Sequence, residues 1–188
     1  MNSLHLAAWF VDAALPGTTP DPAVILGGTG LLREFISVAG NWVGGGQLSI
    51  ATPYIGQGIA KGILPLRDMD HPQIDLLIVT QTKKEASRAY REIGSFPWRS
   101  LAICLCPGLH AKIYAFVPRS GGGVSLVGSH NLTRAGAGIN DEAGVLFLSR
   151  SGSDICRMVL ICHDRISELS VVGEKLFDSV RWPEKYSV

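Results

Sequence analysis

The chain has 188 residues, 46% of them hydrophobic and 18% charged, and its formal net charge at pH 7 is +1. This length and composition exclude a disordered chain and predict one domain, spanning residues 1–188, with a substantial core. The small net charge excludes a strong overall field for nucleic acid, so a nucleic-acid surface would have to come from local basic clusters.

Apolar patterns predict the secondary structure in chain order. Strands are predicted at residues 4–11, 47–52, 74–80, 100–106, 109–117, 123–128 and 142–149, and helices at 30–42, 57–64, 83–93 and 154–170. Strand–helix alternation in the first half and a hairpin in the second predict an α/β fold, in which helices cover both faces of a mixed β-sheet. The segment Gly27–Gly30 lacks the Gly-Lys-Ser/Thr ending of a phosphate loop, and we interpret it as a turn into the first helix.

The sequence indicates neither a membrane segment nor a metal site. The apolar N-terminus lacks a basic leader and a cleavage signal, and no apolar run is long enough to cross a membrane. Cys104, Cys106, Cys156 and Cys162 do not form the paired Cys-x-x-Cys pattern of a zinc site. We therefore expect a cytoplasmic protein with reduced thiols, no cofactor and no membrane partner.

A His-x-Lys pair on a predicted strand gives the first chemical signal. Between Leu109 and Val117 apolar residues alternate with His110, Lys112 and Tyr114, which places His110 and Lys112 on one face of that strand. A neutral imidazole can attack phosphorus and form a phosphohistidine, while a neighbouring ammonium neutralises the non-bridging oxygens. Taken alone, each residue is better explained as a surface side chain, so the hypothesis depends on the residues that follow.

A glycine-rich turn and a second strand bring further polar residues to the same end of the predicted sheet. Gly128 permits close backbone approach, and Ser129 and Asn131 supply neutral donors for phosphate oxygens. Glu142 opens the next apolar run, where its carboxylate could accept the distal N–H of His110 and fix the imidazole tautomer. Two alternatives stay open, namely that Ser129 only shapes the turn and that Glu142 is an ordinary strand-end carboxylate.

These spacings resemble the phospholipase D superfamily, whose signature is H-x-K followed by a G-S-x-x-N or G-S-x-N turn. The resemblance is strongest over residues 98–148, and the wording Gly-Leu-His-Ala-Lys-Ile-Tyr with Gly-Ser-His-Asn-Leu-Thr-Arg looks most like nuclease domains attached to restriction enzymes and helicases. It implies a phospholipase D-like α/β/α catalytic domain whose reaction uses no metal. It also implies a role for each motif residue: His110 as the nucleophile, Lys112 and Asn131 as phosphate ligands, Ser129 assisting, and Glu142 orienting the histidine.

Residues around the motif modify this expectation in two ways. The Asp that the family carries five residues after the lysine is Val117 here. That Asp usually plays a supporting part, so the departure bears on the fine positioning of the site more than on activity. Arg119, on the hairpin turn, and Arg134, just after the motif, are candidates for contacts with substrate phosphates, because both are predicted to lie near the chemistry.

The mechanism that the resemblance implies needs a second histidine, which protonates the leaving oxygen. None of His5, His71, His130 and His163 is followed two residues later by lysine, and we interpret His163, in a helical pattern, as a helix-surface residue. One motif per chain therefore predicts a symmetric homodimer, with two His110 side chains facing each other across a two-fold axis. Such a pair would titrate as a coupled unit and give a bell-shaped pH dependence of the rate.

The sequence leaves three functions open. The leading one is a metal-independent phosphodiesterase, in particular an endonuclease that hydrolyses DNA or RNA. The second is a phospholipase or phosphatidyl transferase acting on lipid phosphodiesters, against which stand the single motif and the lack of a membrane segment. The third is a non-catalytic dimeric binding module of a larger nucleic-acid-processing system, with a separate helicase or recognition partner.

Overall fold

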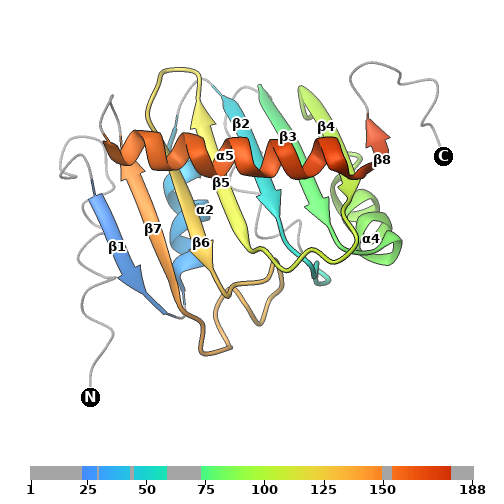
Figure 1. The fold of residues 1–188 in the computed structure, drawn as a ribbon, viewed down its shortest axis with the longest axis horizontal. Helices are drawn as coiled ribbons and strands as arrows, with labels where there is room; N and C mark the ends of the chain where they lie inside the picture. The colour runs from blue at the N-terminus through green and yellow to red at the C-terminus, as the bar shows by residue number, and fades with distance from the viewer. Residues whose placement is uncertain (1–22, 29, 43–44, 59–72, 150–153, 179–188) are drawn as a thin grey trace.

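The computed structural model describes residues 23–28, 30–42, 45–58, 73–149 and 154–178. Its frame is one eight-stranded mixed sheet with the strand order β1-β7-β6-β5-β2-β3-β4-β8 (Figure 1). The strands are β1 (Ala23–Gly27), β2 (Gly46–Ala51), β3 (Ile74–Thr80), β4 (Ser100–Leu105), β5 (Ile113–Pro118), β6 (Gly123–Gly128), β7 (Gly144–Ser149) and β8 (Glu174–Asp178). The neighbours β2, β3 and β4 are parallel, and the other neighbouring strands pair antiparallel.

Helices cover both faces of this sheet. The described helices are α2 (Leu31–Gly40), α4 (Lys83–Ile93) and α5 (Asp154–Val172). Figure 1 shows α5 lying across one face, with α2 and α4 behind the sheet on the opposite face. The predicted α/β fold, a mixed sheet between helical layers, is therefore confirmed. Within the described residues, no helix combines the length and the apolar character that crossing a membrane requires.

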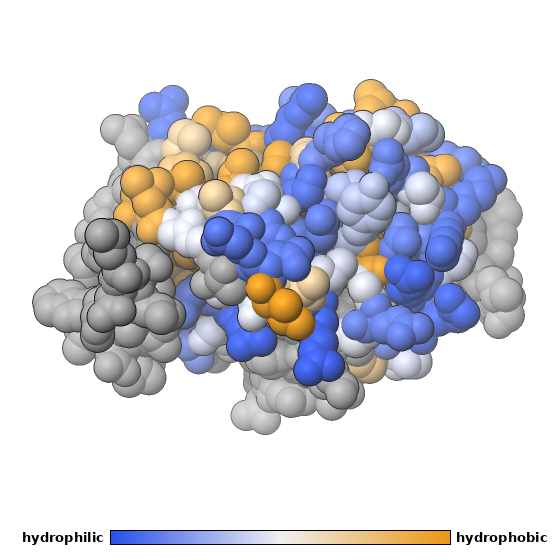
Figure 2. All heavy atoms as spheres, turned by 90° about the horizontal axis from the view of Figure 1, so that it is seen from below, coloured by the Kyte–Doolittle hydropathy of each residue, from blue (hydrophilic) through white to orange (hydrophobic). Residues whose placement is uncertain are grey.

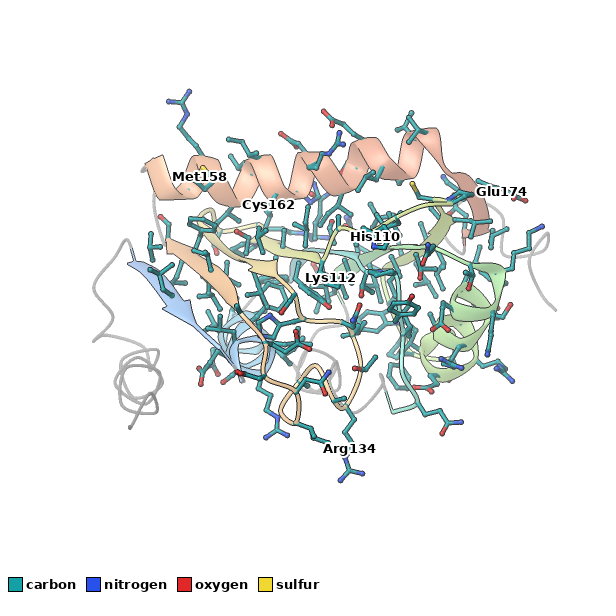
Figure 3. The ribbon with its side chains drawn as sticks, turned by 60° about the horizontal axis from the view of Figure 1, so that its bottom comes forward. His110, Lys112, Arg134, Met158, Cys162 and Glu174 are labelled. Atoms are coloured by element: carbon teal, nitrogen blue, oxygen red, sulfur yellow. The ribbon has the colours of Figure 1, made fainter. Side chains whose placement is uncertain are left out.

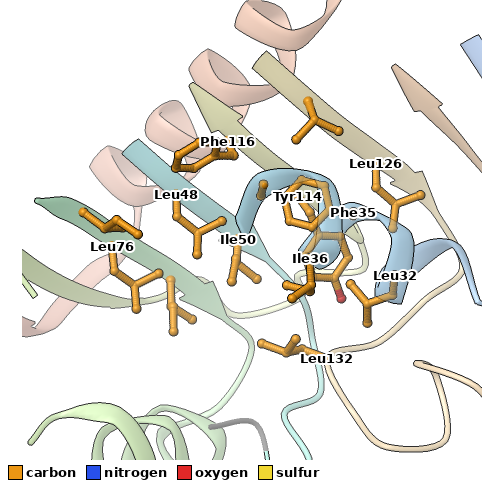
Figure 4. Close-up of a cluster of buried hydrophobic side chains, with 14 of the residues drawn as sticks. Leu32, Phe35, Ile36, Leu48, Ile50, Leu76, Tyr114, Phe116, Leu126 and Leu132 are labelled. Atoms are coloured by element: carbon orange, nitrogen blue, oxygen red, sulfur yellow. The ribbon is translucent and has the colours of Figure 1, made fainter. Parts of the chain in front are cut away.

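The larger core lies between the sheet and the helices α2 and α4. Leu48 of β2 and Tyr114 of β5 point to this side and are fully buried. Phe35 of α2 packs on the Tyr114 ring, with 5.8 Å between the ring centroids (Figure 4). The opposite face, under α5, carries smaller side chains such as Ala51 and Ala115. Large residues on one face and small ones on the other let both helical layers pack against the same strands.

Most predicted elements agree with the structure. The ranges predicted for β3, α4 and β6 coincide with the observed bounds, and those for β2, β4, β7, α2 and α5 differ by at most two residues at either end. The predicted strand at 4–11 lies outside the described residues, as does most of the predicted helix at 57–64. The strands β1 and β8 were not predicted. Each is an edge strand of five residues with a single neighbour in the sheet. Because five residues give few alternations, a period-two pattern is hard to recognise in them.

The strand predicted at 109–117 begins later than expected. Ile113 is the first residue of β5, and it pairs with Ala51, the last residue of β2. Residues 109–112 therefore extend beyond the end of β2, where a period-two pattern alone does not make a strand. His110 and Lys112 consequently lie in the loop that leads into β5, and the prediction that they share a strand face is wrong.

The interpretation of His163 as a helix-surface residue is also wrong. His163 lies on the side of α5 that faces the sheet and is half-buried, and its Nδ1 atom is 2.9 Å from the Ser49 hydroxyl of β2. Burial lowers the pKa of the imidazole, and the neighbouring Asp164 carboxylate opposes this shift. His163 thus belongs to the contact between helix and sheet. The four cysteines are free thiols, with Cys104 and Cys162 buried.

Candidate active site

The motif residues gather at one edge of the sheet. The carboxyl ends of β2, β3 and β4 meet there, together with the start of β5, and the end of β6 pairs with the start of β7 at Gly128 and Gly144. Loops 52–58, 106–112 and 129–143 leave the sheet at this edge. The carboxyl ends of parallel strands are the usual place for ligands in open α/β sheets. The sequence therefore delivers its polar motif residues to a location suited to a binding site.

His110 and Lys112 are neighbours within the loop 106–112 (Figure 3). His110 is exposed and Lys112 half-buried, and the Lys112 ammonium donates a hydrogen bond to the carbonyl of His110 at 3.0 Å. Buried Leu109 anchors this loop, and its N–H donates to the carbonyl of Cys106. The bond from Lys112 involves the backbone of His110, and no described residue forms a hydrogen bond with the His110 imidazole. Its ring nitrogens are therefore available to a ligand or to a second protomer.

Gly128 joins the two halves of the motif. Its N–H donates to the carbonyl of Lys112 at 3.2 Å, so the end of β6 is fixed against the loop that carries His110. A Cβ atom at Gly128 would lie 2.4 Å from the carbonyl oxygen of Ala143, a backbone clash that only glycine avoids. The close approach predicted at this glycine exists, and the neighbour is the segment that enters β7.

Ser129 and Glu142 are paired across the motif turn. The Ser129 hydroxyl donates a short hydrogen bond to the Glu142 carboxylate and accepts one from the N–H of Ala143 at 3.0 Å. Glu142 is buried and also accepts from the Asn140 amide at 3.2 Å. The hydroxyl has one hydrogen, so donation to a phosphate would require it to turn away from Glu142. The contact between Glu142 and His110 stays a prediction.

Asn131 carries an unsatisfied acceptor. Its side-chain oxygen is buried without a hydrogen-bond partner among the described residues. The backbone around it is fixed, because its carbonyl accepts from the N–H of Thr133 at 2.8 Å and the chain at Gly136 packs directly against it. Ser125 Oγ and His130 Nδ1 are likewise buried without a partner among the described residues, so this feature is shared with a second atom of the same turn. The oxygen of an amide only accepts, so a phosphate would be bound by the NH2 group of Asn131.

Sequence reasoning missed the role of His130. This side chain is fully buried, its Nε2 atom lies 3.1 Å from the carbonyl of Gly28, and its own carbonyl accepts from the Tyr114 hydroxyl at 2.8 Å. Burial raises the pKa of that phenol. His130 therefore ties the motif turn to the segment after β1. Its ring packs closely against Gly128 and Gly144, where a Cβ would come within 3.0 to 3.1 Å of it, but this packing is visible only in the folded chain.

The two arginines chosen from the sequence lie in different places. Arg119 follows β5 in the hairpin, at the end of the six-residue strand opposite to the motif, about 20 Å from its start. Its guanidinium donates to the Gln73 side chain at 2.6 Å. The predicted proximity of Arg119 to the chemistry is wrong, and Arg119 is not part of the site. Arg134 is exposed on the loop 129–143, and Figure 3 shows it at the outer end, away from His110.

Comparison with solved structures identifies the fold. Nuc from Salmonella typhimurium, a phospholipase D family member, is similar with a TM-score of 0.56 at 13% identity, over 83% of this chain and 99% of that one. Phosphatidylserine synthase from Haemophilus influenzae Rd KW20 is similar with a TM-score of 0.56 at 15% identity, over 90% of this chain and 45% of that one. TrmBL2, an archaeal chromatin protein that binds DNA, is similar with a TM-score of 0.50 at 11% identity, over 90% of this chain and 60% of that one.

No family model and no curated protein matches the sequence. At the identities found, the solved structures establish the fold alone, and that fold is phospholipase D-like. The expected resemblance is thus confirmed at the level of the fold, while the particular branch of the superfamily is not. Within the described residues, no three His, Cys, Asp or Glu side chains form a group that could hold a metal ion.

Proposed function

Because the chain combines a phospholipase D-like fold with the residues of H-x-K and G-S-x-N at one edge of its sheet, we propose that it is a phosphodiesterase. We propose further that it is a metal-independent nuclease, which cleaves DNA or RNA through a phosphohistidine on His110. One observation carries this proposal. The exposed His110 and the side chain of Asn131 belong to two loops that Gly128 joins through its hydrogen bond to Lys112.

The first step forms the covalent intermediate. The lone pair of a His110 ring nitrogen makes a bond to phosphorus as the bond to the leaving strand breaks, and the leaving oxygen takes that electron pair. The Lys112 ammonium neutralises charge on the non-bridging oxygens, and the NH2 group of Asn131 donates hydrogen bonds to them. Ser129 and Glu142 hold the turn that presents Asn131, since each is bonded to the other and Ser129 also to the entry of β7.

The leaving oxygen needs a proton that His110 itself has no means of supplying. No second H-x-K sequence occurs in the chain, so we propose a homodimer in which His110 of the partner subunit is the general acid. In the second step that imidazole, now neutral, accepts a proton from water. The water oxygen attacks phosphorus, the N–P bond breaks, and its electron pair returns to the first His110. Both histidines end the cycle in their starting protonation states.

A cleavage assay in excess EDTA tests the proposal. Wild-type protein and the His110→Ala variant are incubated with labelled single- and double-stranded DNA and RNA. We expect cleavage by the wild type alone, because the variant lacks both the nucleophile and the acid. Wild-type reactions stopped in alkali should also contain a protein–oligonucleotide adduct, since phosphohistidine is labile in acid. Turnover by His110→Ala would refute the covalent mechanism, and sedimentation of both proteins tests the dimer.

A lipid phosphodiester is the second candidate, favoured by the likeness to phosphatidylserine synthase. Release of the head group from phosphatidylcholine or cardiolipin vesicles, with every nucleic acid left intact, would establish it. A third outcome is binding of nucleic acid without cleavage of any substrate. That result would point to a non-catalytic module or to an enzyme that needs a separate helicase or recognition partner.

A further inference from the structure

One exposed aromatic ring lies at the edge of the sheet that carries the motif. Tyr54, in the loop 52–58 after β2, is 53% exposed, and no other aromatic side chain in the described part of the chain is as accessible. Exposing a large ring to water forgoes the free energy of burying it. Figure 2 views the molecule from below, where hydrophilic side chains cover more of the described surface than apolar ones.

The backbone that carries the ring is rigid. The Thr52 hydroxyl donates to the carbonyl of Tyr54 at 3.2 Å. The next residue, Ile55, is fully buried, its N–H donates to the Glu85 carboxylate at 2.8 Å, and its carbonyl accepts from Arg88. Both sides of Tyr54 are thus fixed while its ring faces solvent. A ring held in this way loses little conformational entropy when a ligand packs against it.

The same backbone is joined to the phosphate-binding turn. Ile55 forms a parallel β-bridge with Leu132, and the N–H of Gly56 donates to the carbonyl of Leu132 at 2.8 Å. Tyr54 and Asn131 are the residues that precede the bridged pair in the two segments. The bridge therefore brings the backbone that carries the ring next to the backbone that carries the amide proposed as a phosphate ligand.

A ring beside a bound phosphate is suited to stack on the base attached to that phosphate. Aromatic stacking tolerates every base, because each has a π-face. In a duplex these faces are hidden by the neighbouring base pairs, whereas a single strand can turn a base outward. We propose that Tyr54 stacks on a base next to the scissile phosphate and that the substrate is therefore a single-stranded nucleic acid. This inference rests on the proposed phosphodiesterase function.

Binding and cleavage are tested with matched oligonucleotides. One is a normal single strand, one has the same length but abasic sugars throughout, and one is the corresponding duplex. Tyr54→Ala is compared with Tyr54→Phe, which keeps the ring. We expect wild type and Tyr54→Phe to prefer the base-bearing single strand, and we expect Tyr54→Ala to lose roughly ten-fold in kcat/KM on it, the scale of one lost base stack. The preference over the abasic strand should shrink by the same factor.

Fluorescence anisotropy in the His110→Ala background separates this inference from the proposed reaction, because it measures binding without cleavage. A roughly ten-fold rise in Kd on adding Tyr54→Ala, seen with the base-bearing strand and not with the abasic one, supports stacking even if no cleavage is found. Equal losses on both strands would overturn it, as would a preference for the duplex. Conversion of a dimer to a monomer by Tyr54→Ala would overturn it too, by assigning the ring to a protein contact.

Discussion

The Ser129 hydroxyl donates to the Glu142 carboxylate and accepts from the N–H of Ala143, so one side chain satisfies two groups at the entry of β7. Glu142 is buried, and Ser129 and the Asn140 amide are its hydrogen-bond donors. A buried carboxylate that loses a donor keeps its desolvation cost. The serine of the G-S-x-N turn therefore has a structural task that precedes any contact with a phosphate.

Ser129→Ala should consequently lower both stability and activity. The variant loses the hydrogen bond to the buried carboxylate and the one from the N–H of Ala143, which together should cost about 2–3 kcal/mol of the free energy of unfolding, measurable by urea denaturation. The kcat should fall as well, because the turn that presents Asn131 loosens. Ser129→Thr, which keeps the hydroxyl, is the matched control and should retain most of both. Unchanged stability in Ser129→Ala would contradict the structural task.

Gly128→Ala tests the close approach between β6 and the entry of β7. The added Cβ would lie 2.4 Å from the carbonyl oxygen of Ala143, and relieving that contact should cost about 1–3 kcal/mol of stability. Gly121→Ala is the control, because its strain arises from a φ of 90° in the hairpin at the far end of the sheet. Both variants should melt at lower temperature, and Gly128→Ala alone should lose kcat. Equal activity of the two would argue against the coupling of Gly128 to the site.

The elements that could be predicted are those whose signal is local. The helix at 83–93 follows a capping residue, Thr82, whose side chain accepts from the N–H of Glu85, and its apolar residues recur with helical period. The hairpin strand at 123–128 is bounded by glycines. The choice of His110, Lys112 and Asn131 depended on the local spacing of the motif and on its resemblance to the phospholipase D superfamily, and the fold delivers all three to one edge.

What could not be predicted depends on contacts far apart in the chain. His130 reaches the carbonyl of Gly28, 102 residues away, and nothing in the turn itself indicates burial. The start of β5 is set by the end of its partner β2 at Ala51, which pairs with Ile113. The alternation of apolar and polar residues begins before this point, so it wrongly placed His110 on the strand. Arg119 was misplaced for a similar reason. It is close to the motif in sequence, but the whole of β5 lies between them and separates them in space.

His130→Ala should destabilise the fold by about 2–4 kcal/mol, because it leaves a cavity and removes the hydrogen bond to Gly28. A carbonyl only accepts, so Nε2 carries the hydrogen in that bond. His130→Gln keeps an N–H donor of similar reach and should lose less. Urea denaturation of both variants checks the order. Equal losses would show that the ring contributes only by filling space.

His163 predicts a pH dependence of stability. Burial lowers its folded-state pKa below the ordinary 6.5. At pH values between these two pKa values the unfolded chain therefore binds more protons than the folded one. The contribution of His163 to stability is therefore complete above pH 6.5 and decreases as the pH falls from 6.5 toward the folded pKa. His163→Gln should flatten the curve of unfolding free energy in this window. An unchanged slope would contradict burial of the imidazole.

Arg119 and Arg134 form a matched pair for the path of the substrate. Arg134 is exposed at the outer end of the site loop, so it could contact a phosphate some distance from the scissile one, whereas Arg119 lies at the other end of β5. Arg134→Ala should raise KM and reduce the slope of log affinity against log salt by about one, the signature of one phosphate contact. Arg119→Ala should leave kcat/KM and the salt slope as in the wild type, because its guanidinium pairs with Gln73 instead. A salt slope that falls with Arg119→Ala and not with Arg134→Ala would place the nucleic acid along the hairpin end of the sheet. It would then have to cross the full length of β5 to reach His110.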